Sequence, residues 1–273
     1  MASRSALITV MAGAAYKAAR GLIRDFGEVE NLQVSLKGPR NFVTAADLQA
    51  EKVLHAELSR ARPGFGFLLE ESGTIEGGDP RRRWIVDPLD GTINFLHGIP
   101  HFAISIALER DRQIVAGVVY DPLRDELFRA EQGVGAYLND RRLRVSARRT
   151  LADAVVAVGK PGRRAGERPD LLIHLEGVAA ETVGVRRFGS ASLDLAYVSA
   201  GRFDGFWQAG LAPWDLAAGI LLVREAGGYV TDLEGGDDVL GTGGVLAANP
   251  TLHPQLLRLV RREERAAGAA GRP

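Results

Sequence analysis

A stripe of apolar residues opens the chain at the spacing expected of a helix. Its members are Leu7, Met11, Ala14, Ala18, Leu22 and Phe26. Recurrence every three or four residues predicts an amphipathic helix. Arg4 and the apolar residues after it also resemble a short signal peptide, but the stripe continues past any cleavage point, so we expect the helix in the mature protein. A second helical pattern spans residues 45–60 and ends before Pro63.

Shorter runs rich in β-branched and aromatic residues follow, and they predict strands. These runs cover residues 65–69, 83–86, 102–109, 113–120, 126–130 and 135–138. The polar residues 110–112 lie between two long runs and are typical of a hairpin turn. Residues 1–145 are thus expected to pack two helices against a largely antiparallel sheet.

From residue 146 onward, short strands are expected to alternate with helices. The strands are predicted at residues 154–158, 185–188, 203–207 and 244–247, and the helices at residues 170–180, 191–200, 213–226 and from residue 251. This rhythm is typical of a layered α/β fold. A chain of 273 residues lies near the size at which one core divides. We therefore expect one compact unit with two halves, residues 1–145 and 146–273.

The composition excludes several classes of chemistry. Lys and Arg total 34, as do Asp and Glu, so no net field attracts nucleic acid or an anionic membrane. The absence of cysteine excludes disulfides, thiolate metal sites and cysteine nucleophiles. Beyond the first helix, no stretch approaches the roughly 18 apolar residues of a membrane span. We expect a cytoplasmic protein with neither a membrane nor a nucleic-acid partner.

The segment W-I-V-D-P-L-D-G-T-I-N-F, residues 84–95, has the most distinctive pattern. A buried strand ends in Asp87 and Asp90, and Gly91 and Thr92 then open a helical turn. Carboxylates at a strand end can hold a cation, while amides at a helix start point toward an incoming anion. Asp-Pro and Asp-Gly are also common turn dipeptides, so this segment alone leaves a purely structural interpretation open.

Other acidic residues stand at comparable positions. Glu70 and Glu71 end an apolar strand, and Asp215 lies in the first turn of a predicted helix. Asp47 follows Thr44 at the spacing of a capping box. Each also has a structural interpretation, since paired glutamates are often solvated and an aspartate at a helix start complements the helix dipole.

Together these segments resemble the inositol monophosphatase family in order, spacing and flanking residues over nearly the whole chain. The matching motifs are Val43-Thr44-Ala45-Ala46-Asp47, Glu70-Glu71-Ser72, Asp87-Pro88-Leu89-Asp90-Gly91-Thr92, Phe188-Gly189-Ser190-Ala191 and Pro213-Trp214-Asp215-Leu216-Ala217-Ala218-Gly219. The resemblance implies a five-layer αβαβα sandwich, a homodimer and a lithium-sensitive, Mg²⁺-dependent phosphatase.

The resemblance also implies a role for each matching residue. The ligands of two or three Mg²⁺ ions would be Glu70, Asp87, the carbonyl of Leu89, Asp90 and Asp215. The Thr92 hydroxyl, ordered by Asp47 and aided by Glu70, would position the attacking water. The substrate-binding residues would be Asp90, Gly91, Thr92, Gly189, Ser190, Ala191, Gln208 and Asp215.

Elementary electrostatics agrees with a metal site. Two carboxylates about 4 Å apart repel by roughly 4 kcal/mol at an effective dielectric constant near 20, so a carboxylate cluster needs cations. A ligand set made only of oxygens suits Mg²⁺ better than zinc.

Three residues depart from the family pattern. Asn41 stands where an aspartate is common in the loop after Lys37, which bears on the weakest metal site. Leu69 replaces a glycine that usually precedes Glu-Glu-Ser. Gln208 replaces a glutamate that often binds inositol hydroxyls. The catalytic set is complete, but the substrate pocket differs from the usual one.

Several functions remain open at this point. Inositol 1-phosphate is the expected substrate, and fructose 1,6-bisphosphate, histidinol phosphate and a phosphoadenosine nucleotide are alternatives within the same chemistry. An alternative of another class is a regulatory member of the fold that binds RNA or protein. A nucleotide-binding oxidoreductase is disfavoured, because no G-x-G-x-x-G motif follows a strand and opens a helix.

Overall fold

The computed structural model describes residues 4–28, 34–36, 42–159 and 171–270. Its larger sheet has eight strands, in the order β10-β9-β8-β7-β6-β5-β3-β4. In chain order these are β3 (Phe65–Leu69), β4 (Gly73–Ile75), β5 (Asp79–Asp90), β6 (Ala103–Arg110), β7 (Gln113–Asp121), β8 (Glu126–Glu131), β9 (Gly135–Leu138) and β10 (Arg141–Arg142). Only β3 and β5 run parallel among these neighbours, so the predicted antiparallel character is confirmed.

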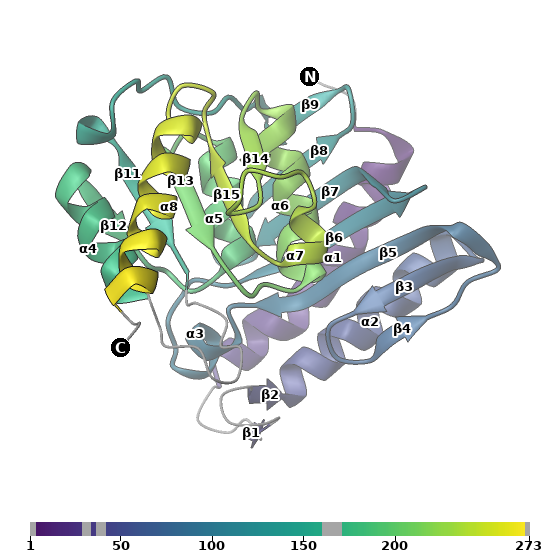
Figure 1. The fold of residues 1–273 in the computed structure, drawn as a ribbon. Coiled ribbons are helices and arrows are strands. Elements are labelled where there is room, and N and C mark those ends of the chain that lie inside the picture. Colours follow the sequence, from purple (N-terminus) through teal and green to yellow (C-terminus); the bar gives the residue numbers. More distant parts are fainter. Residues whose placement is uncertain (1–3, 29–33, 37–41, 160–170, 271–273) are drawn as a thin grey trace.

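Two long helices cover one face of this sheet. They are α1 (Ala6–Phe26) and α2 (Ala45–Ala61), and Figure 1 shows them lying across its strands. Met11 and Leu22 of α1 and Leu54 of α2 are fully buried with Trp84 of β5. Burial of their apolar stripes, rather than helix propensity, therefore holds these helices in place. A separate ribbon pairs β1 (Val34–Leu36) with β2 (Phe42–Thr44).

A second sheet of five strands has the order β12-β11-β13-β15-β14. The strands are β11 (Val155–Val158), β12 (Gly184–Arg186), β13 (Gly205–Gln208), β14 (Tyr229–Thr231) and β15 (Val245–Ala248). Helices α4 (Leu171–Glu181) and α8 (His253–Ala270) cover its outer face. Short elements complete the chain: α3 (Thr92–Leu96), the 3-10 turn Leu151–Asp153 and α7 (Val239–Thr242).

The middle layer consists of α5 (Ala191–Ser199) and α6 (Pro213–Glu225). One core cluster joins Ile85 and Val119 of the larger sheet, Leu195 and Leu222 of the two helices, and Phe206 of the smaller sheet. The helices are thus buried between the two sheets (Figure 1). This arrangement confirms the predicted αβαβα sandwich. Every residue of α5 is buried, which explains why its apolar residues follow no single stripe.

Several predicted boundaries differ from the structure. The strand expected at residues 83–86 is part of β5, which begins at Asp79 and continues to Asp90. Its first residues are polar because they lie at the sheet end, where Arg83 forms an ion pair with Glu109. The strand expected at residues 185–188 ends at Arg186. The short strands β4 and β14 and the short helix α7 were not predicted, because three or four residues carry too little periodicity.

Helix α1 is long and apolar enough to cross a membrane by length and composition alone, and within the described ranges it is the one helix of this kind. Eight of its residues are nevertheless buried in the core. Helix α1 therefore packs one face into the protein core, as its amphipathic sequence predicted.

A glycine on β7 allows α6 to approach the larger sheet closely. A Cβ atom on Gly117 would lie 3.0 Å from Cα and 3.1 Å from the carbonyl oxygen of Ala218. Since backbone atoms cannot rotate away, we predict that Gly117→Ala lowers the free energy of unfolding by about 1–3 kcal/mol. Urea unfolding measures this change. Gly13→Ala, at an exposed position of α1 with open space around it, should instead raise stability by up to ~1 kcal/mol. Equal effects of the two substitutions would contradict this account of Gly117.

Candidate active site

Three aspartates meet where β5 ends and α6 begins. Asp87, Asp90 and Asp215 each offer a carboxylate oxygen within 4.8 Å of the others. In a regular strand, residues three apart point to opposite faces. Here Asp87 pairs with Ser105 and Asp90 with Ala103, so β5 has one more residue than β6 over this stretch. We infer that this bulge turns both aspartates toward one side.

Two of these carboxylates accept hydrogen bonds from backbone amides two or three residues away. The Leu89 amide donates to Asp87 Oδ1 at 2.9 Å, and the Ala212 amide donates to Asp215 Oδ2 at 2.8 Å. Asp215 thereby caps the first turn of α6, as its structural interpretation proposed. The same carboxyl group also forms a hydrogen bond with the side chain of Asp87, which joins it to the cluster.

Burial makes the charged form of these aspartates unfavourable. It raises the pKa of Asp87 well above its usual range, with further contributions from the charges of Glu70, Asp90 and Asp215. Burial and the charge of Asp90 raise the pKa of Asp215 to about 8. The pKa of Asp90 is also raised by burial, although hydrogen bonds from Ser190 and Ser192 oppose the shift. Such a cluster stays ionised at neutral pH only when a cation compensates it.

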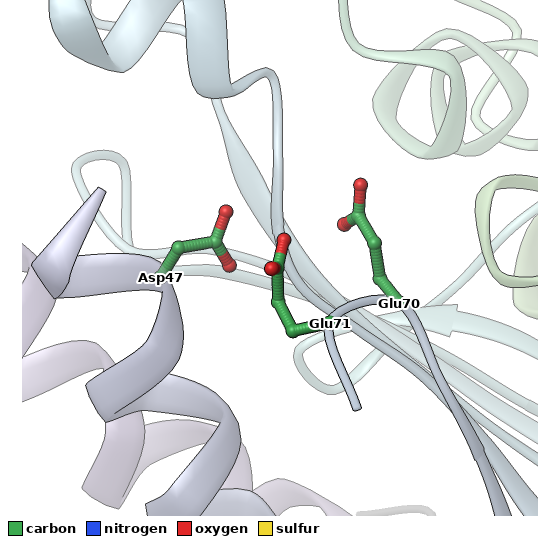
Figure 2. Close-up of side chains that lie close together, drawn as sticks. All are labelled: Asp47, Glu70 and Glu71. Carbon is green, nitrogen blue, oxygen red and sulfur yellow. The ribbon is translucent and has the colours of Figure 1, made fainter. Parts of the chain in front are cut away.

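A second acidic cluster lies beside the first. Asp47, Glu70 and Glu71 have carboxylate oxygens within 4.8 Å of one another. Figure 2 shows Asp47 leaving the start of α2 and both glutamates leaving the turn after β3. Because β3 is parallel to β5, with Leu69 beside Val86, its carboxyl end delivers Glu70 next to Asp87. The charges of Glu70 and Asp47 both contribute to the raised pKa of Asp87, so the two clusters form one acidic site.

Buried Glu51 orders the turn that carries the glutamates. Its carboxylate accepts a hydrogen bond from the Glu71 amide at 2.8 Å and another from the Ser72 hydroxyl. These bonds tie the turn after β3 to α2, and so the two elements that supply the second cluster are held together.

The chain next to Asp90 turns sharply at Gly91 and enters a short helix. Gly91 has φ of 101°, and a Cβ there would lie 3.0 Å from the His101 carbonyl oxygen, so only glycine fits without strain. Thr92 begins α3, and its hydroxyl donates to the Leu89 carbonyl at 2.9 Å. The buried ring of Phe95 packs 5.0 Å from that of Phe102 and anchors this short helix in the core. The amides of Gly91 and Thr92 as phosphate donors stay a prediction.

The predicted pocket residues Gly189, Ser190 and Ala191 follow β12 and lead into α5. Ser190 contacts the acidic site directly, since its hydroxyl donates to Asp90 Oδ2 at 2.6 Å. Gly189 has φ of 84°, which suits glycine at the turn into the helix. Ala191 is buried as the first residue of α5. The structure thus brings this loop to the metal-ligand candidates.

Gln208 ends β13 and is partly buried. A Cβ atom on Gly159 would lie 1.4 Å from Gln208 Oε1, so the glutamine side chain lies directly over Gly159. Its contact with substrate stays a prediction. Leu69 is buried at the end of β3, consistent with a residue that sets the strand end. Lys37 and Asn41, and with them the question of a third metal site, lie outside the described residues.

Three residues of the site were given no role in it from the sequence. Glu71 belongs to the second cluster, and its position next to Glu70 in the sequence could have indicated this. Ser192 donates to Asp90 and follows the Phe188-Gly189-Ser190-Ala191 motif by one position. Asn94 donates to the carbonyls of His101 at 2.8 Å and Phe188 at 2.7 Å, which joins α3 to the predicted pocket loop. Nothing in local periodicity identifies such long-range bonds.

Comparison with known proteins agrees with this geometry. The model of the inositol monophosphatase family matches residues 3–265. The chain belongs to the inositol monophosphatase family. An inositol-1-monophosphatase of Mesorhizobium japonicum is 60% identical over 95% of this chain and 98% of its own. The Nus factor SuhB of Escherichia coli is 43% identical over 94% of this chain and 96% of its own.

A solved structure supports the same assignment. The crystal structure of the extragenic suppressor protein suhB from Bartonella henselae superposes with a TM-score of 0.91. It is 58% identical and covers 94% of this chain and 98% of its own. As an inositol monophosphatase family member, the protein is a phosphoric monoester hydrolase. The acidic site fits the metal dependence of this family, since its candidate ligands are oxygens that need positive charge.

The raised pKa of Asp215 predicts that the metal-free protein is less stable at pH 8 than at pH 6. Without metal, native Asp215 keeps its proton to about pH 8, while the unfolded chain loses it near pH 4. The native state therefore binds more protons, and its stability falls as pH rises between these values, by up to ~1.4 kcal/mol per pH unit for one proton. A metal ion would bind the ionised form, so stabilisation by added Mg²⁺ should be larger at pH 8 than at pH 6.

Thermal unfolding at both pH values, with Mg²⁺ or with chelator, measures this difference. Asp215→Asn should weaken the pH dependence in both conditions, because the amide does not titrate. Equal stabilisation by Mg²⁺ at pH 6 and pH 8 in the unaltered protein would contradict the prediction.

Proposed function

We propose that this protein hydrolyses inositol 1-phosphate to inositol and phosphate with Mg²⁺, as a cytoplasmic homodimer. The observation that carries the proposal is the pairing of a buried carboxylate site with the start of α3, which offers amides next to Asp90. Cation ligands and anion donors side by side are what a phosphate monoester bound with metal requires.

Magnesium ions would be held by carboxylates of both clusters together with one backbone carbonyl: Glu70, Asp87, Leu89, Asp90 and Asp215. Bound magnesium lowers the pKa of a water ligand, neutralises phosphoryl oxygens and stabilises the leaving alkoxide. In the net reaction, a bond forms from the water oxygen to phosphorus, the ester P–O bond breaks, and inositol leaves with a proton.

The residues of the chain would orient the reactants. The amides of Gly91 and Thr92 would bind the phosphate, and loop 189–191 with Gln208 would receive the inositol ring. Because the Thr92 hydroxyl donates its hydrogen to the Leu89 carbonyl, its oxygen can still accept a hydrogen bond from water. Glu70 would help to position this water and accept the proton that it releases, and Asp47, which the resemblance gives the role of ordering Thr92, lies beside Glu70 in the second cluster.

A regulatory role is the alternative of another class. The Escherichia coli relative that is 43% identical is named a Nus factor, and this name favours a regulatory role. The acidic site favours catalysis, because buried carboxylates that destabilise the metal-free fold have no evident use in a protein that only binds RNA or protein. Turnover measurements separate the two possibilities.

Thr92→Ala should lower kcat by roughly 100-fold or more and leave KM within a fewfold, because the hydroxyl orients water while backbone amides still bind phosphate. Steady-state kinetics with inositol 1-phosphate and Mg²⁺ measures both constants. Thr92→Ser, which keeps the hydroxyl, is the matched control and should retain most of kcat. A variant with altered KM alone would remove Thr92 from the catalytic role.

The substrate is tested with four esters in the presence of Mg²⁺: inositol 1-phosphate, fructose 1,6-bisphosphate, histidinol phosphate and a phosphoadenosine nucleotide. We expect the highest kcat/KM for inositol 1-phosphate. Gln208→Glu adds a charged acceptor for inositol hydroxyls, and it should raise the preference for this ester by about 5-fold, equivalent to ~1 kcal/mol. An unchanged ranking would mean that Gln208 does not contact the substrate.

A further inference from the structure

We propose that Ser192, together with Ser190, is a positioning residue that holds one oxygen of Asp90 and thereby aims the other at the metal site. The inference deepens the proposed function and rests on it, because it assigns to α5 a role in binding Mg²⁺. It concerns how tightly the metal is held, and neither serine is placed in the chemical step.

The contacts are concentrated on a single atom. Asp90 Oδ2 accepts hydrogen bonds from the Ser190 hydroxyl at 2.6 Å, the Ser192 amide at 2.8 Å and the Ser192 hydroxyl at 2.5 Å. All three residues are buried, with Ser192 fully so. Both serines lie about a hundred positions from Asp90 in the sequence, so these bonds join β5 to the start of α5.

Three donors on Oδ2 restrict the orientation of the Asp90 carboxyl group. Without such bonds an aspartate carboxylate rotates about its side-chain torsions. Cation binding would then carry the entropy cost of fixing that rotation. The Ala191 amide also forms a hydrogen bond with the Asp90 carboxylate. Because three donors converge on Oδ2, we infer that Oδ1 is the oxygen directed at a cation shared with Asp87 and Asp215. Partners of this kind are known to set metal affinity, since they hold a ligand in its binding orientation.

The start of α5 strengthens the arrangement. The first amides of a helix lack partners within it and carry partial positive charge, which favours an anion. Asp90 receives the Ser192 amide in this region. The anion is therefore stabilised by the helix start and by both hydroxyls, although burial opposes ionisation.

This geometry changes the part expected of Ser190. Its hydroxyl hydrogen is directed at Asp90, so toward a substrate hydroxyl Ser190 can act only as an acceptor. Ser192 is buried behind it and has no predicted contact with substrate. A change at Ser192 thus reaches the substrate only through Asp90, and a Mg²⁺ titration without substrate isolates its effect on the metal site.

The same helix provides a matched control. Ser199 is as deeply buried as Ser192, but its hydroxyl donates to the Ala196 carbonyl at 2.7 Å within α5. Ser199→Ala and Ser192→Ala each remove one buried hydroxyl from α5. Only the second removes a hydrogen bond to a candidate metal ligand.

The test is a calorimetric titration of the full-length protein with Mg²⁺, followed by kinetics over a range of Mg²⁺ concentrations. Ser192→Ala should weaken Mg²⁺ binding roughly 10-fold, Ser190→Ala should do the same, and Ser199→Ala should stay within about 2-fold of the unaltered protein. At saturating Mg²⁺, kcat of Ser192→Ala should return to the unaltered value, because the reacting groups are intact.

The possible outcomes separate this inference from the proposed function. Mg²⁺ binding by Ser192→Ala as tight as that by Ser199→Ala, with normal binding by the unaltered protein, would overturn the role of Ser192 alone. No Mg²⁺ binding by the unaltered protein would overturn the proposed function and this inference with it. If urea unfolding finds Ser192→Ala unfolded, Ser190→Ala decides the question in the same titration.

Discussion

Repulsion among buried carboxylates is the constraint on which the rest of this structure depends. Asp87 is surrounded by the charges of Glu70, Asp90, Asp215 and Asp47 and is almost fully removed from water. Without a compensating cation, folding must force protons onto these groups, which is unfavourable at neutral pH. The acidic site therefore destabilises the metal-free fold, and the large cores on either side of each sheet supply the stability that offsets it.

The fold gathers these charges with a few backbone devices. Parallel pairing of β3 with β5 brings Glu70 beside Asp87, and the bulge in β5 turns Asp90 to the same side. The close contact of Gly117 with Ala218 sets α6 against the sheet, so that its first turn delivers Asp215. Each device belongs to an element whose other residues are buried in a core, so hydrophobic packing determines the geometry of the polar site.

Much of this could be predicted from the sequence, for identifiable reasons. Helix α1 spans the predicted apolar stripe from Leu7 to Phe26, and α6 ends one residue before its predicted bound, because apolar spacing and Pro213 are local signals. The acidic residues were predicted because a strand end and a helix start are recognisable without a structure. The role of Ser192 was not, since its bond to Asp90 depends on how α5 packs against β5. Likewise, Asn94 joins two carbonyls that are remote in sequence from each other.

Those long-range bonds explain how one site can serve both parts of a phosphate ester. Asn94 ties α3, next to the predicted phosphate position, to the loop that begins at Phe188, and Asp90 ties β5 to α5. Asp194, one turn further along α5, is buried with no hydrogen-bond partner for either oxygen among the described residues. Burial and the charge of Asp90 raise its pKa well above the usual range. The charged form of Asp194 is therefore disfavoured, and the start of α5 favours the single anion of Asp90.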